Sequence, residues 1–167
     1  MGYADAGYKS DVVSSRSQTG YLFLQNNAPI CWKSVKQTVT ATSTNHSELL
    51  AFHAATKEAV WLYNTNKLIK GQAGLDAPSK SITIFEDNAG VVAQVQAGFI
   101  KSENTKHVNP QIFSFTQELI SGGCIDVQKV ESAHNLADFL TKPLPAHHHR
   151  RLVEAAGMKL LHELISN

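Results

Sequence analysis

The chain has 167 residues, 43% of them hydrophobic and 17% charged, which suits one folded domain with a sizeable core and excludes a disordered chain. Its formal net charge of +1 excludes a polycation, so binding to nucleic acid would depend on local basic patches. No apolar run approaches the roughly 20 residues of a membrane span, and the first residues lack the pattern of a signal peptide, so no membrane partner is expected. Its two cysteines are expected to be reduced thiols of an intracellular protein.

The first 41 residues predict an antiparallel meander. Strand formers are concentrated in separate runs, and the turn signal Asn26-Asn27-Ala28-Pro29 interrupts them. The expected strands are 2–6, 19–25, 30–34 and a short extended piece at 38–41.

Residues 46–69 predict the first helix, because apolar side chains recur there at steps of three and four residues. The residues on this face are Glu48, Phe52, Ala55, Ala59 and Leu62. Three good N-cap residues, Ser43, Thr44 and Asn45, precede the pattern, and Gly71 is a plausible stop.

The second half of the chain predicts a strand at 81–86, helices at 89–97 and 110–120, and a strand at 125–130. Residues 134–142 are expected to be helical, followed by a final amphipathic helix at 147–165. The order βββ-α-β-α-α-β-α, with an extra C-terminal helix, indicates an α/β fold with a mixed five-stranded sheet and flanking helices. We expect one domain over 1–145 and a C-terminal helix within 146–167 that packs on it or extends it.

Four acids occupy local settings that place them in this fold. Asp5 lies in the opening strand, Glu48 lies in the first turns of the first helix, and Asp87 follows the alternating strand residues Ile82-Thr83-Ile84-Phe85. Asp138 lies in the predicted helix 134–142. If the fold brings them together, four carboxylates supply the oxygen ligands for two divalent metal ions.

Each acid also has an alternative interpretation. Glu48 alone could complement the helix macrodipole, Asp87 could be a turn residue after a strand, and Asp138 could be a solvated helix acid. Asp5, in a strand that should be half-buried, has no comparable structural explanation. The functional interpretation therefore depends on their joint occurrence in this order.

This order of elements and acids resembles the ribonuclease H fold. Several short sequence motifs, among them Gly2-Tyr3-Ala4-Asp5-Ala6, are similar to motifs of the ribonuclease H domain of copia-type LTR retrotransposons. The others are 17–21, 29–34, 36–39, 105–107 and 135–144, so the resemblance runs from residue 2 to about residue 145.

The sequence departs from the family in three ways. The family's first strand usually begins a few residues upstream of the Gly2-Tyr3-Ala4-Asp5 word. Cellular members carry a histidine-bearing loop before the fourth acid, whereas here only Glu131-Ser132-Ala133-His134 precedes the predicted helix. The polymerase, integrase and protease regions of a retroelement polyprotein are not in this sequence. We therefore expect an excised domain or a stand-alone descendant.

The resemblance implies a metal-dependent endoribonuclease that hydrolyses the RNA strand of RNA–DNA hybrids, with two Mg²⁺ ions and Mn²⁺ as a substitute. Asp5 would bridge the two ions, and Glu48 and Asp87 would complete the position that orients the substrate and the leaving oxygen. Asp138 would bind the ion that activates water. The products would carry a 5′-phosphate and a 3′-hydroxyl.

Several other residues are nucleic-acid contacts by the same resemblance. Those expected at the minor groove of the hybrid are Ser43, Thr44, Asn45 and Asn88; helix capping is the alternative, and both roles are compatible. Those expected at the DNA backbone are Lys101, Lys106 and His107, for which a solvated loop is the alternative.

His134 precedes Asp138 by four residues, which would place both on one helix face and make His134 an auxiliary proton shuttle or phosphate contact. A histidine at a helix start with no catalytic role is the alternative.

A domesticated domain that binds nucleic acid or protein without catalysis is the second function that the sequence allows. The expected partners of the enzyme are an RNA–DNA hybrid and a reverse transcriptase polymerase domain. The expected location is the cytoplasm, within a virus-like particle, or the nucleus.

Overall fold

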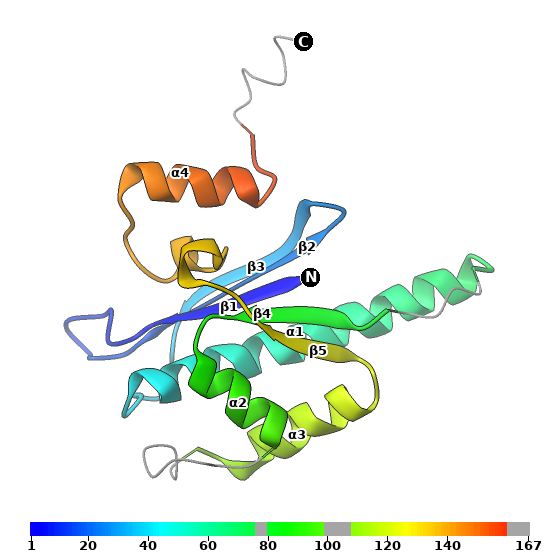
Figure 1. The fold of residues 1–167 in the computed structure, drawn as a ribbon, viewed down its shortest axis with the longest axis horizontal. Coiled ribbons are helices and arrows are strands. Elements are labelled where there is room, and N and C mark those ends of the chain that lie inside the picture. The colour runs from blue at the N-terminus through cyan, green and yellow to red at the C-terminus, as the bar shows by residue number, and fades with distance from the viewer. Residues whose placement is uncertain (76–79, 99–107, 160–167) are drawn as a thin grey trace.

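The structure is a computed structural model that describes residues 1–75, 80–98 and 108–159, and a five-stranded mixed sheet lies at its centre (Figure 1). The order across the sheet is β3-β2-β1-β4-β5. The strands are β1 (Gly2–Gly7), β2 (Gln18–Gln25), β3 (Ala28–Lys36), β4 (Ile82–Glu86) and β5 (Ile125–Lys129). The mixed sheet that the sequence predicts is thereby confirmed.

The N-terminal half of the sheet is an antiparallel meander of β1, β2 and β3, and β4 runs parallel to β1 and β5. Asn26 and Asn27 form the tight turn between β2 and β3 with φ of 52° and 60°, values that asparagine tolerates better than most residues. The pairing of β1 with β4 is short and joins only Gly2 to Ile84 and Tyr3 to Phe85. The extended piece expected at 38–41 is wrong, because the chain leaves the sheet after Lys36 and turns towards the first helix.

Three helices cover one face of the sheet and a fourth covers the other (Figure 1). On the first face lie α1 (Thr44–Gln72), α2 (Ala89–Ala97) and α3 (Pro110–Ser121), and on the second lies α4 (Ala146–Ala155). Each of the first three begins at a side-chain cap: Ser43, Asn88 and Asn109. Within the described part of the chain, no helix is long and apolar enough to cross a membrane.

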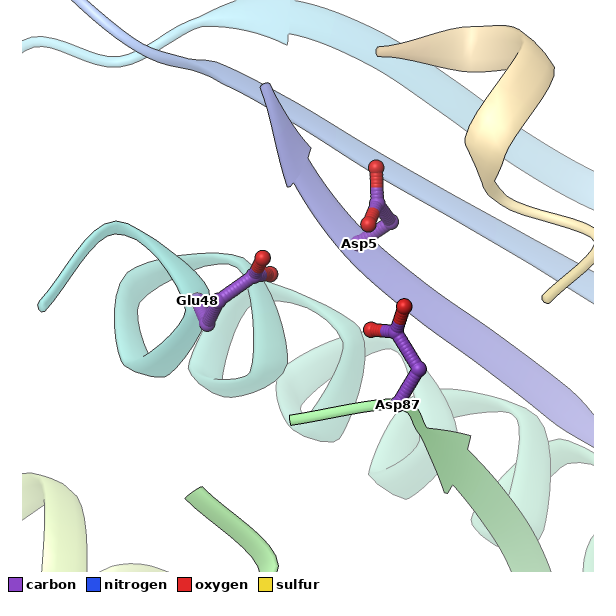
Figure 2. Close-up of side chains that lie close together, drawn as sticks. All are labelled: Asp5, Glu48 and Asp87. Atoms are coloured by element: carbon purple, nitrogen blue, oxygen red, sulfur yellow. The ribbon is translucent and has the colours of Figure 1, made fainter. Parts of the chain in front are cut away.

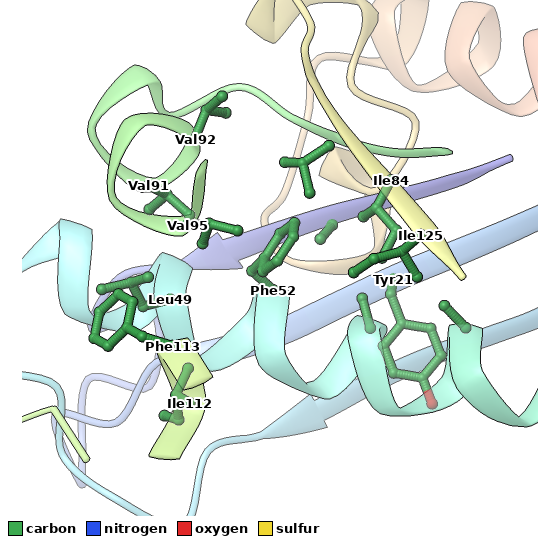
Figure 3. Close-up of a cluster of buried hydrophobic side chains, with 14 of the residues drawn as sticks. Tyr21, Leu49, Phe52, Ile84, Val91, Val92, Val95, Ile112, Phe113 and Ile125 are labelled. Carbon is green, nitrogen blue, oxygen red and sulfur yellow. The ribbon is translucent and has the colours of Figure 1, made fainter. Parts of the chain in front are cut away.

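The strand alternation of β2 divides the core into two clusters. Tyr21 and Phe23 join the cluster under α1, α2 and α3, which Figure 3 shows around Phe52 and Ile84. Leu22 and Leu24 point to the other face, where they pack with Leu136, Leu152 and Ala156. β2 is therefore buried on both faces, whereas β3 beside it is mostly exposed, and the packed strands give rigid support to the side chains that they carry.

The helix expected at 134–142 is wrong. Two 3₁₀ turns replace it, η2 (Ser132–His134) and η3 (Asp138–Leu140). Asn135 explains the change, because its buried side chain donates from Nδ2 to the carbonyl oxygen of Ala4 at 2.8 Å and accepts from the backbone N–H of Ala137 at 3.1 Å. These bonds compete with the helical backbone pattern and fasten the turn to β1 instead.

The final helix is shorter than the expected 147–165. It begins at Ala146 and ends at Ala155, where Gly157 adopts a left-handed conformation with φ of 85°. The N–H of Gly157 bonds to the carbonyl of Glu154, and that of Met158 bonds to the carbonyl of Val153. This is the arrangement by which a glycine terminates a helix. Residues 160–167 lie outside the described residues.

Two glycines allow the segment around η3 to pack closely on the sheet. A Cβ atom on Gly7 of β1 would overlap the backbone oxygen of Thr141, and one on Gly20 of β2 would overlap the Thr141 methyl group. Since the first clash is with backbone, no rotamer change relieves it. Gly7 therefore sets how near Asp138, three residues before Thr141, comes to β1.

We expect Gly7→Ala to destabilise the fold by about 1–3 kcal/mol, because the backbone at Thr141 must shift. Thermal or urea denaturation measures the change. Gly71→Ala is the matched control: the space around Gly71 in α1 is open, and alanine is the better helix former, so its stability should be equal or slightly greater. Equal stability of Gly7→Ala and the unmodified protein would contradict this account.

Candidate metal centre

Three of the four predicted acids converge near the C-terminal ends of the neighbouring strands β1 and β4. Asp5 comes from β1, Glu48 from the first turns of α1, and Asp87 from the residue that follows β4. Figure 2 shows the three side chains grouped between these elements. Each offers one carboxylate oxygen, and these atoms all lie within 4.8 Å of one another.

Local structure explains why each acid is held there. Ser43 caps α1 by accepting a hydrogen bond from the N–H of His46, and this fixes the start of the helix five residues before Glu48. Asn88 caps α2 in the same way and so fixes the sharp connection that carries Asp87. Asp5 is held by the pairing of β1 with β2, in which it lies opposite Gly20.

Burial makes the ionised forms of these acids costly. Asp5 is 1% exposed and Glu48 is 6% exposed. Desolvation, with charge repulsion from neighbouring acids, raises the pKa of Asp5 to about 6 and that of Glu48 to about 9. For Glu48 the repelling neighbours are Asp5 and Asp87. Glu48 is therefore mostly protonated at neutral pH in the metal-free domain, and a cation beside it would favour its ionised form.

The donor set fits a divalent cation of the hard class. Its atoms are carboxylate oxygens, which Mg²⁺ and Mn²⁺ prefer. Moreover, Oε2 of Glu48 is buried and has no hydrogen-bond partner among the described residues. A buried oxygen of this kind requires a partner, and a metal ion between the acids would provide one.

The fourth acid, Asp138, is linked to this group by a lysine that forms ion pairs with both Asp138 and Asp5. Asp138 lies in η3, and its Oδ1 is 2.9 Å from Nζ of Lys142, which is 3.5 Å from Oδ1 of Asp5. Thr141 donates a hydrogen bond from its hydroxyl to the other oxygen of Asp5. The roles of Thr141 and Lys142 were not predicted from the sequence, although both residues lie in the same motif as Asp138, residues 135–144.

Comparison with known proteins relates the chain to retrotransposons. No family model matches. The chain is 29% identical over 157 residues, 94% of its length, to the Retrovirus-related Pol polyprotein from transposon TNT 1-94 of Nicotiana tabacum. It is 30% identical over 136 residues, 78% of its length, to the Transposon Ty1-JR1 Gag-Pol polyprotein of Saccharomyces cerevisiae. A shorter match, 44% identical over 71 residues, is to the Secreted RxLR effector protein 161 of Plasmopara viticola.

The chain spans only 11% of the first of these relatives, 50% of the effector and 7% of the Ty1 polyprotein. Among solved structures, it is similar to LC11-RNase H1, isolated from compost, with a TM-score of 0.59 and 16% identity over 84% of this chain and 90% of that one. The same enzyme in complex with an RNA/DNA hybrid gives a TM-score of 0.56 and 14% identity over 84% and 91%. The chain is a ribonuclease H-fold domain of the retrotransposon Pol type.

The connection before the fourth acid of this ribonuclease H-fold domain is short, as expected. Only two residues, Val130 and Glu131, separate β5 from η2. His134 lies in η2 with its ring 3.5 Å from Glu131 and largely exposed. The shared helix face with Asp138 is absent because no α-helix forms there. The auxiliary role of His134 therefore loses its geometric basis and stays an untested prediction.

A fifth acid, Glu86, belongs to the centre and was missed. It is fully buried beside Glu48, and burial raises its pKa well above the ordinary value. Its Oε1 accepts a hydrogen bond from the N–H of Asn88, and its Oε2 has no partner among the described residues. The strand pattern offered a signal, because Glu86 shares the inward face of β4 with Ile82 and Ile84.

The predicted nucleic-acid contacts divide into two groups. In the first, Ser43 and Asn88 act as helix caps, and Asn45 donates a hydrogen bond to Gln94 of α2 at 3.0 Å. This bond holds the start of α1 beside α2, next to the acids, while Thr44 is exposed. The capping alternative is thus seen directly, and contact with a hybrid stays a prediction. The second group, Lys101, Lys106 and His107, lies outside the described residues.

We expect the metal-free domain to lose stability as the pH rises from about 4.5 to about 9. The pKa of Glu48 is raised from 4.5 to about 9, so the stability that its neutral form provides is fully present below pH 4.5 and is lost as the group ionises. Thermal denaturation in a chelator at pH 5, 7 and 9 measures the loss.

Glu48→Gln cannot ionise and is the matched variant for this measurement. The melting temperature of both proteins is measured at pH 5 and pH 9. The decrease should be a few degrees smaller for Glu48→Gln than for the unmodified protein. Parallel profiles for the two proteins would show that Glu48 is not the group responsible.

Proposed function

We propose that this chain is a metal-dependent endoribonuclease that hydrolyses the RNA strand of RNA–DNA hybrids. The observation that carries the proposal is the convergence of Asp5, Glu48 and Asp87 within 4.8 Å, two of them buried, on a ribonuclease H fold. A cluster of buried acids is rarely found without a cation where its role is only structural, because each ionised carboxylate raises the free-energy cost of ionising the next. The relationship to retrotransposon Pol polyproteins supports the same activity.

The acids divide into two positions that share Asp5. Glu48 and Asp87 lie on one side of it, and Asp138 lies on the other, across Lys142. Two Mg²⁺ ions, with Mn²⁺ as a substitute, would activate the attacking water and neutralise charge on the scissile phosphate. Asp5 would be the shared ligand, with Glu48 and Asp87 completing one position and Asp138 the other. The products would carry a 5′-phosphate and a 3′-hydroxyl.

Discrimination between RNA and DNA would fall to the helix starts beside the acids. Asn45 and Asn88 present amide groups at the ends of α1 and α2, which the Asn45–Gln94 hydrogen bond holds together. The minor groove of a hybrid exposes the 2′-hydroxyls of its RNA strand, which such amides can bind. LC11-RNase H1, which shares this fold, has been solved with a bound RNA/DNA hybrid.

A polymerase domain would supply the remaining affinity for the hybrid. The net charge of +1 gives the chain little general attraction for a polyanion. Tethering to a second nucleic-acid-binding module raises the effective concentration of the substrate without new contacts. The relatives are Pol polyproteins of which this chain covers a small part, and this supports such a partner.

Cleavage of an end-labelled RNA–DNA hybrid tests the proposal. We expect hydrolysis of the RNA strand in Mg²⁺ or Mn²⁺, and none of single-stranded RNA or duplex DNA. Asp5→Asn should lower the rate at least about a hundredfold, because both metal positions share this ligand. Asp11→Asn is the matched control, since Asp11 forms its ion pair with Lys36 and does not belong to the group of acids, and its rate should be unchanged.

Absence of cleavage in both metals, by a protein shown to be folded, would contradict the enzyme. The assay is repeated with a separately supplied or fused reverse transcriptase domain before that conclusion is drawn. Binding of the same hybrid, measured by fluorescence anisotropy, would then distinguish the non-catalytic nucleic-acid-binding domain from one that interacts with protein.

A further inference from the structure

Lys142 occupies a place in the centre that the proposed chemistry does not use. Its ammonium nitrogen lies 2.9 Å from Asp138 and 3.5 Å from Asp5, between two carboxylates that are almost fully buried. The lysine side chain itself is 38% exposed. The positive charge therefore lies against both acids, while part of the lysine side chain is exposed to solvent.

Positive charge is distributed unevenly over the acids. On the side of Asp138, both oxygens of Asp5 are engaged, one by the ammonium group of Lys142 and the other by the hydroxyl of Thr141. On the side of Glu48 and Asp87, no lysine, arginine or histidine of the described residues forms an ion pair, and Oε2 of Glu48 has no hydrogen-bond partner. One cation position is thus filled by the chain itself, and the other has no positive group.

We propose that Lys142 is a tethered counter-ion that takes the place of the second metal ion in the metal-free domain and must leave before that ion binds. The inference depends on the metal-binding part of the proposed function. A first divalent ion enters among Asp5, Glu48 and Asp87 without displacing any side chain. A second ion, between Asp5 and Asp138, competes with Lys142 for the same oxygens.

The side chain is suited to leaving. A lysine stem is flexible, and its ammonium group is well solvated once it swings into water. The backbone N–H of Lys142 donates a hydrogen bond to the carbonyl oxygen of Asp138 at 3.3 Å, and Pro143 follows directly, so the backbone can stay in place while the side chain moves. Competition by a tethered group raises the apparent Kd of the second ion, which equals the intrinsic Kd divided by the fraction of time that the position is free.

Titration with Mn²⁺ alone tests the inference, with calorimetry or the electron paramagnetic resonance of free Mn²⁺ as the readout. We compare the unmodified domain, Lys142→Met and Lys36→Met. Lys142→Met keeps the length of the stem and removes the charge. Its second Mn²⁺ should bind about tenfold more tightly, as expected if Lys142 fills the position nine-tenths of the time. The Kd of the first ion should change little.

Lys36→Met is the matched control because Lys36 also pairs with an aspartate, Asp11, which is not one of the acids of the centre. Lys36 lines the same surface cavity as Lys142, so a general effect of removing a nearby positive charge would appear in this variant as well. Both of its Mn²⁺ affinities should equal those of the unmodified domain. Circular dichroism in chelator establishes that each variant is folded, and Lys142→Gln serves as the second variant if Lys142→Met is not.

A direct measurement on the unmodified domain follows the lysine itself. Acetylation by a limiting amine reagent, read residue by residue by mass spectrometry, should be slow at Lys142 in chelator. It should become several-fold faster when Mn²⁺ displaces the ammonium group into solvent. Lys36 provides the internal reference, and its labelling should not depend on Mn²⁺.

Unchanged or weaker Mn²⁺ binding in Lys142→Met, together with metal-independent labelling of Lys142, would overturn the inference and make the lysine a fixed structural partner of Asp138. Failure of both proteins to bind Mn²⁺ would also overturn it. The proposed function is judged separately by hybrid hydrolysis. Metal-dependent labelling without hydrolysis would support the lysine inference alone, and hydrolysis with unchanged labelling would support the function alone.

Discussion

The mutual repulsion of buried carboxylates is the constraint on which the rest of this structure depends. Asp5, Glu48 and Glu86 are buried side by side, with Asp87 and Asp138 next to them. In a medium of low dielectric constant, each ionised member makes the next more costly to ionise. The domain has two ways to reduce this cost without metal: protons, held by acids whose pKa is raised, and the ammonium group of Lys142.

Such an arrangement persists only on a scaffold that cannot relax away from it. Packing on both faces of the sheet fixes β1 and β4, caps fix the starts of α1 and α2, and Gly7 lets the turn that carries Asp138 sit close on β1. These elements are held by hydrophobic burial and by the hydrogen bonds of helix caps. The site is thus supported by interactions that do not depend on whether it is charged, protonated or metal-bound.

Sequence patterns predicted those parts of the fold whose signals are local. The apolar face of α1 repeats over several turns, and the predicted 46–69 lies within three residues of the observed bounds. The helices expected at 89–97 and 110–120 also match α2 and α3 to within one residue. Three of the four acids lie together as expected, because strand ends and helix starts meet at sheet edges. The helix predicted at 134–142 was wrong because the hydrogen bond from Asn135 to Ala4 joins residues 131 positions apart, which no local pattern reveals. The role of Lys142 was not predicted for a similar reason, because its ion-pair partner Asp5 is distant in sequence.

The short pairing between β1 and β4 has a consequence for how this site can vary. The two strands are bonded only at Gly2 with Ile84 and Tyr3 with Phe85, and beyond that point they separate, with Asp5 on one branch and Asp87 beyond the end of the other. The space between Asp5 and Asp87 therefore begins where these two strands separate within the sheet. Lengthening or shortening the surface connections leaves this separation intact. A slip of one residue in the pairing would turn Asp5 to the opposite face of β1 and bring Ala4 into its place.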